Sequence, residues 1–136
     1  MDLSRSMKIA AAGLDAQATR LKTVSENLAN ASSTANTPGG LPYRRKAVTF
    51  ANVLDRALEA RLVKVAKVEE VPGNFERRYD PTHPAADKDG YVLTPNVNPL
   101  LELMDMREAQ RSYQANLNVI DAAKTMISRT LDLLHS

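Results

Sequence analysis

The apolar residues of this chain follow a helical pattern at each end. In residues 1–31 and 100–136 the apolar side chains recur at intervals of three and four positions. This spacing places them along one face of an α-helix. Each stripe is narrow, which is typical of helices that pack along a seam rather than on a broad core. The sequence therefore predicts two long terminal helices that need a partner, either each other or neighbouring copies of the chain.

Polar residues mark where the two helices begin. Asn98 is a favourable N-cap and Pro99 suits the first helical position, so we expect the second helix to span about 99–134. Asp2 or Ser4 is suited to cap the first helix, which we expect over 3–31. At ~1.5 Å per residue the two helices would be roughly 40 Å and 50 Å long.

The middle of the chain is unsuited to long helices, because all seven prolines lie within residues 38–99. Residues 50–60 fit either a short helix or a loop, and residues 80–90 fit a long turn. β-branched residues and partial alternation predict three strands, at Tyr43–Phe50, Leu62–Val71 and Tyr91–Thr94. The predicted fold class is mainly α, with a turn-rich, β-containing or extended insert between two long helices.

The composition excludes several classes of chemistry. The chain has no cysteine, which removes disulfides, thiolate catalysis and cysteine-based zinc sites. Its 18 basic and 16 acidic residues give a formal charge of only +2, unlike a dedicated nucleic-acid binder. No apolar run approaches the ~20 residues that span a bilayer, and the first residues lack a signal-peptide pattern. We therefore expect no direct membrane insertion.

One cluster resembles a metal or acid–base site. His83 lies near Asp80, Asp87 and Asp89, and the run Asp-Lys-Asp-Gly is similar to part of a calcium-binding loop. Asn96 stands where such a loop needs a glutamate, six residues after its glycine. Prolines flank His83, which favours a rigid surface turn, and the common catalytic motifs are missing. The sequence predicts no enzyme, metal or cofactor, and a small metal-binding protein using the His83 cluster is kept as an alternative.

The densest basic cluster consists of Arg44, Arg45 and Lys46. A nucleic-acid surface usually needs more charge and several aromatic side chains, and Tyr43 alone offers little. The cluster fits equally a charged strand edge or a contact with an acidic neighbour. A DNA-associated helical protein is therefore a second alternative.

Charge is also sorted along the middle of the chain. Residues 44–67 hold seven basic and two acidic side chains, whereas residues 69–89 hold six acidic and three basic ones. The two stretches could complement each other within one protomer or between neighbours. The other interpretation is that both are solvated faces.

Four asparagines lie in the predicted helices, although asparagine is a mediocre helix former. A polar side chain in a buried seam can fix the register of two helices at some cost in stability. Alternatively, these side chains face solvent, or one of them only ends its helix. Both interpretations apply to Asn27, Asn30, Asn116 and Asn118.

Three stretches together resemble a known family. Residues 25–46, SENLANASSTANTPGGLPYRRK, are similar to the N-terminal signature of the bacterial flagellar rod and hook axial proteins. Residues 102–134 are similar to the closing helix of those proteins. Residues 79–98, YDPTHPAADKDGYVLTPNVN, resemble more particularly the members that form the proximal rod. The resemblance covers nearly the whole chain in the expected order.

This resemblance implies a structural subunit in the rod of the bacterial flagellar basal body. Such proteins pass through the flagellar type III export apparatus without cleavage of a signal peptide. They assemble into a helical tube across the periplasm that transmits torque and encloses the export channel. The implied partners are other proximal and distal rod proteins, the adaptor between the MS ring and the rod, and copies of this chain, with no nucleic acid.

From this resemblance, we expect two sets of residues to make the contacts of the assembly. We expect residues 1–31 and 100–136 to form an inner coiled-coil layer and residues 32–99 to leave it. The turn motif expected to contact an adjacent subunit consists of Asn30, Asn36, Pro38, Gly39, Tyr43 and Arg44. The expected helix seam consists of Leu14, Leu21, Val24 and Leu28 packed against Tyr113, Leu117, Ile120 and Ile127.

Overall fold

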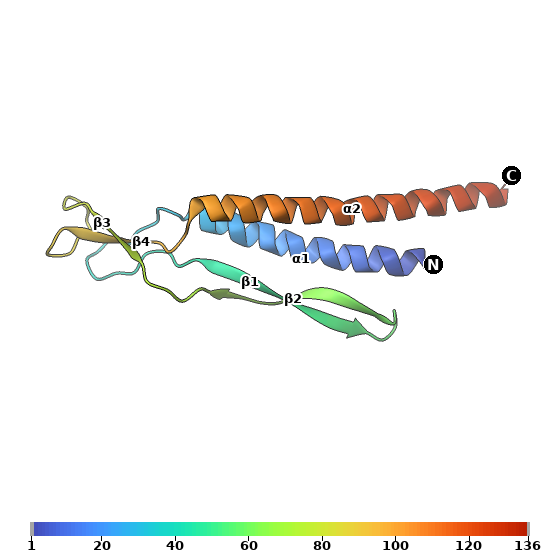
Figure 1. Ribbon diagram of the computed structural model, residues 1–136, viewed down its shortest axis with the longest axis horizontal. Coiled ribbons are helices and arrows are strands. Elements are labelled where there is room, and N and C mark those ends of the chain that lie inside the picture. The colour runs from blue at the N-terminus through green and yellow to red at the C-terminus, as the bar shows by residue number, and fades with distance from the viewer. Residues whose placement is uncertain (1, 136) are drawn as a thin grey trace. The chain divides into compact units, whose positions relative to one another are not determined.

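The computed structural model describes residues 2–135 and has two long helices with short sheets between them (Figure 1). Helix α1 spans Leu3–Ala29 and helix α2 spans Pro99–His135. The four strands are β1 (Lys46–Asp55), β2 (Ala60–Glu70), β3 (Glu76–Tyr79) and β4 (Tyr91–Thr94). The predicted fold class, mainly α with a small β-containing middle, is therefore confirmed.

The chain divides into two compact units. Unit 1 combines α1 up to Leu21 with residues Val48–Lys67 and with α2 from Arg107 onward. Unit 2 combines Lys22–Ala47 with Val68–Met106. Both helices, and strands β1 and β2, thus contribute residues to each unit. The three-part division expected from the sequence stays a prediction.

Both helices begin at the polar caps that the sequence indicates. The carboxylate of Asp2 accepts hydrogen bonds from the backbone N–H groups of Ser4 and Arg5, at 3.0 and 3.2 Å. The side-chain oxygen of Asn98 accepts hydrogen bonds from the N–H groups of the second and third helical residues of α2, at 3.1 and 3.4 Å. These contacts satisfy donors that the first turn of a helix leaves unpaired.

Strands β1 and β2 form a two-stranded hairpin, and this corrects the expectation of a short helix or loop over residues 50–60. The end of β1, a tight turn over residues 56–59 and the start of β2 occupy that stretch. The Asp55 carboxylate accepts hydrogen bonds from the N–H groups of Ala57 and Leu58, at 2.9 and 3.2 Å. Such an Asp-centred turn reverses the chain locally. The helix-like spacing of residues 50–60 therefore yields to turn chemistry.

Strands β3 and β4 form a second antiparallel pair, and the sequence prediction missed β3. Their register places Glu76 opposite Thr94 and Tyr79 opposite Tyr91. The two tyrosine rings meet edge to face, with 5.4 Å between centroids, an arrangement that aromatic pairs favour. Strand β3 carries two arginines and no β-branched residue, so pairing with β4 rather than local propensity defines it.

Within unit 1, α1 and α2 lie side by side and run antiparallel (Figure 1). They approach closely at Gly13, where an added methyl group would lie only 2.7 Å from the side-chain amide of Asn116. The buried apolar side chains of this unit, among the residues described, are all alanines: Ala10, Ala16, Ala109 and Ala123. Small residues let the two backbones approach closely. The finer prediction of a coiled coil stays a prediction.

Neither α1 nor α2 is long and apolar enough, over the residues described, to cross a membrane.

Candidate functional site

Unit 2 contains a buried polar cluster centred on Asn27, a residue that is only 1% exposed. Its amide nitrogen donates hydrogen bonds to the Lys46 carbonyl at 2.9 Å and to the Glu102 carboxylate at 3.2 Å. Its amide oxygen accepts hydrogen bonds from the Tyr43 hydroxyl at 2.7 Å and the Lys46 N–H at 3.0 Å. These four bonds use the full capacity of an asparagine side chain. Asn27 therefore joins α1 to the start of β1 and to α2.

Glu102 brings a buried negative charge into the same cluster. It lies in the first turn of α2 and is 1% exposed. One carboxylate oxygen accepts the Asn27 hydrogen bond and the other pairs with the guanidinium of Arg45. A buried carboxylate is costly unless it is paired and hydrogen-bonded. Both oxygens of Glu102 meet that requirement.

Asn96 extends the cluster to the connector after β2. Its side-chain oxygen accepts a hydrogen bond from the backbone N–H of Arg45 at 2.7 Å, and its nitrogen donates to the Val71 carbonyl at 3.1 Å. The N–H of Val71 donates in turn to the Arg45 carbonyl at 2.7 Å. Asn27, Tyr43, Arg45, Asn96 and Glu102, with the Lys46 backbone, are named the polar cluster below.

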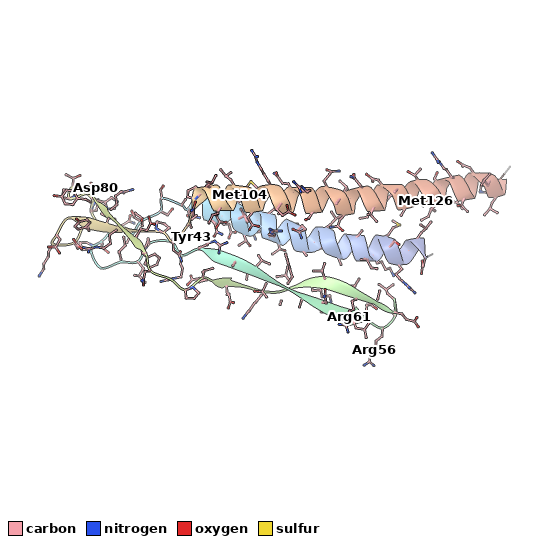
Figure 2. The ribbon with its side chains drawn as sticks, in the orientation of Figure 1. Tyr43, Arg56, Arg61, Asp80, Met104 and Met126 are labelled. Atoms are coloured by element: carbon pink, nitrogen blue, oxygen red, sulfur yellow. The ribbon has the colours of Figure 1, made fainter. Side chains whose placement is uncertain are left out.

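Tyr43 stands at the junction between the helices and β1 (Figure 2). Burial raises the pKa of its hydroxyl above the ordinary value of 10.0, and the nearby carboxylates of Glu26, Glu102 and Glu70 raise it further. Both causes disfavour a charged phenolate. The folded chain therefore keeps Tyr43 protonated, as a donor to Asn27.

The predicted turn motif is ordered by local hydrogen bonds in unit 2. The Asn30 amide donates to the Glu26 carbonyl at 2.9 Å, and its oxygen accepts from the Ser33 hydroxyl at 3.0 Å, so Asn30 closes the end of α1. Gly39 adopts a positive φ of 82°, which suits glycine. Asn36, Pro38 and Gly39 are exposed. Their contact with an adjacent subunit stays a prediction.

Arg44 of that motif contacts the connector after β2. Its guanidinium donates to the carbonyls of Val71 and Gly73, at 3.4 and 3.0 Å, and lies 4.3 Å from the centre of the Phe75 ring. Lys46 lies 3.9 Å from the Glu26 carboxylate. All three members of the basic cluster thus contact groups of their own chain, because Arg45 pairs with Glu102.

The predicted seam residues lie at different depths. Val24 is buried, whereas Leu14, Leu21, Leu28, Tyr113, Leu117 and Ile120 are half-buried and Ile127 is exposed. Apart from Val24, the buried positions described in the two helices are small or polar. In α2 they recur every seven residues, at Glu102, Ala109 and Ala123, with half-buried Asn116 in the same series. Their packing as a seam stays a prediction.

Many large apolar residues of α2 are exposed. The two leucines near its end are the most accessible, with Leu133 at 75% and Leu134 at 76%. Exposed apolar residues that gather in one part of a protein often mark an interaction site. We name the exposed large apolar residues of α2 the apolar surface of α2. They are Leu100, Leu101, Leu103 and Met104 in unit 2, and Val119, Met126, Ile127, Leu131, Leu133 and Leu134 in unit 1.

His83 organises a turn in unit 2. Its Nδ1 accepts a hydrogen bond from the Ala85 N–H at 2.9 Å, which leaves the proton on Nε2 to be donated to the Thr34 hydroxyl at 3.1 Å. Asp87 accepts from the N–H groups of Asp89 and Tyr91, each at 2.9 Å. These groups serve the β3–β4 connection. In residues 2–135, no three His, Asp or Glu side chains are arranged to hold a metal ion.

The carboxylate of Asp87 favours its charged form in this turn. Hydrogen bonding by the Tyr91 N–H, more than offsetting the opposing effect of partial desolvation, lowers its pKa below the ordinary value of 3.8, and the Asp89 N–H and Arg77 add to the effect. Arg77 also lies 4.4 Å from the centre of the Tyr91 ring. Arg77 and Asp87 thus form an ion pair in this hairpin, at 3.3 Å.

The sequence indicates part of the polar cluster but not the burial of its carboxylate, Glu102. Asn27 was one of four asparagines with two open interpretations, and it is the fully buried one. Glu102 reads from the sequence as an ordinary first-turn carboxylate. The signal that could have separated it is its place in the series 102, 109, 116 and 123, where two other members are alanine.

Two family models match the chain. Residues 88–133 match the model described as "Flagellar basal body rod FlgEFG protein C-terminal", and residues 7–39 match "Flagella basal body rod protein". These ranges contain most of α2 and of α1.

Similar proteins extend over the whole chain. The "Flagellar basal-body rod protein FlgC" of Agrobacterium fabrum is 54% identical over 97% of this chain and 95% of its own length. The protein of the same name from Salmonella typhimurium is 41% identical over 98% of both chains. That of Bacillus subtilis is 37% identical over 98% of this chain and 99% of its own. This chain therefore belongs to the FlgC family of flagellar basal-body rod proteins.

Proposed function

We propose that the chain is a structural subunit of the rod in the flagellar basal body, and that its helices pack with those of neighbouring subunits in a helical tube. Relatives that match over nearly the full length are named basal-body rod proteins. The observation that carries the proposal within the molecule is the apolar surface of α2. A structural subunit uses such a surface for assembly rather than for catalysis.

The length of α2 supports this proposal. In unit 1 the antiparallel register places Gly13 opposite Asn116, so the position opposite Leu3, where α1 begins, is Met126. The nine residues from Ile127 to His135 continue α2 past that point, a distance of roughly 13 Å. Leu131, Leu133 and Leu134 lie there, exposed by half or more. Neighbouring subunits are the natural partners for this part of the helix.

The finer features are proposals as well. We propose that the partners include other proximal and distal rod proteins, the adaptor between the MS ring and the rod, and copies of this chain. We also propose export through the flagellar type III apparatus without signal-peptide cleavage, and transmission of torque by the assembled tube. An assembled tube gains rigidity from many repeated interfaces, and its subunit stability becomes inseparable from assembly.

The proposal is tested by placing a charge on the apolar surface without touching the helix pair. Leu131→Asp, in cells that carry the variant as their only copy, should abolish swimming and remove the chain from purified basal bodies. The reason is that an aspartate buried at a subunit interface would have no partner. The measurements are swimming in soft agar and immunoblotting of basal-body fractions.

The matched control is Arg129→Asp, which introduces the same side chain two positions away, on a different side of the same exposed helix. We expect it to swim. Normal swimming and normal incorporation of Leu131→Asp would contradict a role for this surface in the rod.

A further inference from the structure

We infer that two pairs of facing side chains, Asn27 with Glu102 and Gly13 with Asn116, select the register in which α1 pairs with α2. In each pair the two residue numbers add up to 129, one pair in unit 2 and one in unit 1. The pairs are fourteen residues apart on each helix, which is two heptads. The same register is thus specified twice.

Apolar packing by itself discriminates poorly between this register and one shifted by seven residues. Helix α2 has 37 residues and α1 has 27. A shift that brings Ala109 opposite Asn27 would leave every residue of α1 facing α2. It would also place Gly13 opposite Ala123, which is another small residue. The start of α1 would then lie opposite the exposed end of α2. A shift the other way is excluded by length, because Asn27 would face Pro95, before α2 begins.

The polar cluster supplies the discrimination that packing lacks. In the shifted register Glu102 would face position 34, beyond Ala29, where α1 ends. It would lose the hydrogen bond from Asn27, and Asn27 would be left against an alanine. An asparagine or a carboxylate that is buried without its partner is strongly disfavoured, whereas the observed register satisfies both.

The second pair acts by shape. The side-chain amide of Asn116 occupies the space beside Gly13, so that even a methyl group there would lie 2.7 Å from it. The Asn116 nitrogen is held by the Ser112 carbonyl at 2.9 Å in its own helix. In the shifted register Arg20 would take the place of Gly13. A long side chain would then meet the amide where the observed register has none.

Engineered cysteines can report the register, because the chain has none of its own. Ser6 and Ala123 belong to the same heptad series as the two pairs and face each other in the observed register, since 6 and 123 also add up to 129. Ser6→Cys with Ala123→Cys is therefore the reporter of the observed register. Ser6→Cys with Thr130→Cys reports the register shifted by seven residues.

The experiment uses the full-length chain as the only copy in cells. After mild oxidation of freshly lysed cells, the intrachain disulfide is measured by mobility on non-reducing gels. In the parent we expect the 6–123 disulfide to exceed the 6–130 disulfide at least tenfold. Adding Glu102→Leu and Asn116→Ala should raise the 6–130 disulfide at least fivefold relative to the 6–123 disulfide. Because the disulfide lies within one chain, this result does not depend on whether the chain reaches the rod.

Two variants separate a role in register from a role in stability. Glu102→Gln as a single substitution keeps an acceptor for Asn27. This variant should show the same ratio of the 6–130 to the 6–123 disulfide as the parent. Asn118→Ala, at an exposed position two residues from Asn116, is the matched control and should leave the ratio unchanged. An unchanged ratio in the Glu102→Leu, Asn116→Ala variant would overturn the inference. Loss of both disulfides would also overturn it, because the cluster would then supply pairing strength rather than choice of register.

Discussion

The two units join the same pair of helices with opposite kinds of side chain. In unit 1 the buried apolar side chains of α1 and α2, among the residues described, are alanines, and Gly13 faces Asn116. In unit 2 the buried side chains include Asn27 and Glu102, and Asn27 donates a hydrogen bond to Glu102. Arg45 pairs with Glu102, and the Tyr43 hydroxyl donates to Asn27. The first arrangement brings backbones close together, and the second holds specific atoms opposite each other.

The difference shows that close packing and choice of partner are separate tasks in this chain. Small residues at regular spacing allow a close approach in more than one register, because one alanine resembles another. A fully hydrogen-bonded asparagine has only one place where its four bonds are satisfied. The helix pair is therefore expected to be sensitive to polar substitutions in unit 2 and to volume in unit 1.

The largest effect is expected for Asn27→Ala, which removes four hydrogen bonds at once. It leaves the buried Glu102 carboxylate, the Tyr43 hydroxyl and the Lys46 backbone with unmet partners, so we expect the free energy of unfolding to fall by about 3 kcal/mol or more. The measurement is urea denaturation of the full-length chain followed by helical circular dichroism, at a concentration where the chain is helical. Asn118→Ala serves as the exposed control. Similar small losses in both variants would show that the polar cluster is no stronger than a surface contact.

A smaller effect, with a sign that depends on Asn116, is expected for Gly13→Ala. Alanine is favoured over glycine in a helix by about 1 kcal/mol, but overpacking costs about 1–3 kcal/mol. We expect Gly13→Ala alone to lower stability by about 1 kcal/mol, and to raise it by up to about 1 kcal/mol when Asn116→Ala is also present. A double-mutant cycle by urea denaturation measures this coupling. Additive effects would mean that the Asn116 amide moves aside freely.

The smallest effect at neutral pH is expected for Tyr43→Phe, which loses one hydrogen bond to Asn27 at a cost of about 1 kcal/mol. The pKa of Tyr43 is raised in the fold by burial and then by nearby carboxylates. Its contribution is therefore complete below the ordinary value of 10.0 and is lost as the pH rises through the folded pKa. As the pH rises above about 10, the parent should therefore lose more stability than the Phe variant. Parallel losses in urea titrations would rule out a special role for Tyr43, since the other tyrosines are common to both chains.

The predictability of the fold differs between its helices and its strands. The starts of α1 and α2 follow from Asp2, Asn98 and Pro99, because N-capping is a local interaction that the sequence displays directly. Strand β4 was predicted with the bounds that the structure shows. Strand β3 was not, because its arginines and Tyr79 become a strand only through pairing with β4. The hairpin turn after β1 depends on Asp55, whose side chain competes with a helical pattern around it.

The predictability of the site differs in the same way. The sequence singled out Asn27 and Tyr43 but not the buried role of Glu102, because burial of a carboxylate depends on residues 57 to 75 positions away that neutralise or bond it. The half-buried leucines of the expected seam and the buried alanines lie at different angular positions around the axes of the same helices. Periodicity locates the apolar side of a helix, but it does not say which line of that side is closest to the partner.

Two long terminal helices, the caps at their starts, a β-containing middle without cysteine chemistry and a resemblance to flagellar axial proteins can all be inferred from the amino-acid sequence. These features are local, or they are carried by extended motifs. The close contact of Gly13 with Asn116, and the buried cluster that Asn27, Arg45 and Glu102 share, become visible in the folded chain alone. The physical reason is that the free energy of burying a polar group depends on partners that are distant in the sequence, and folding alone brings them within hydrogen-bond reach.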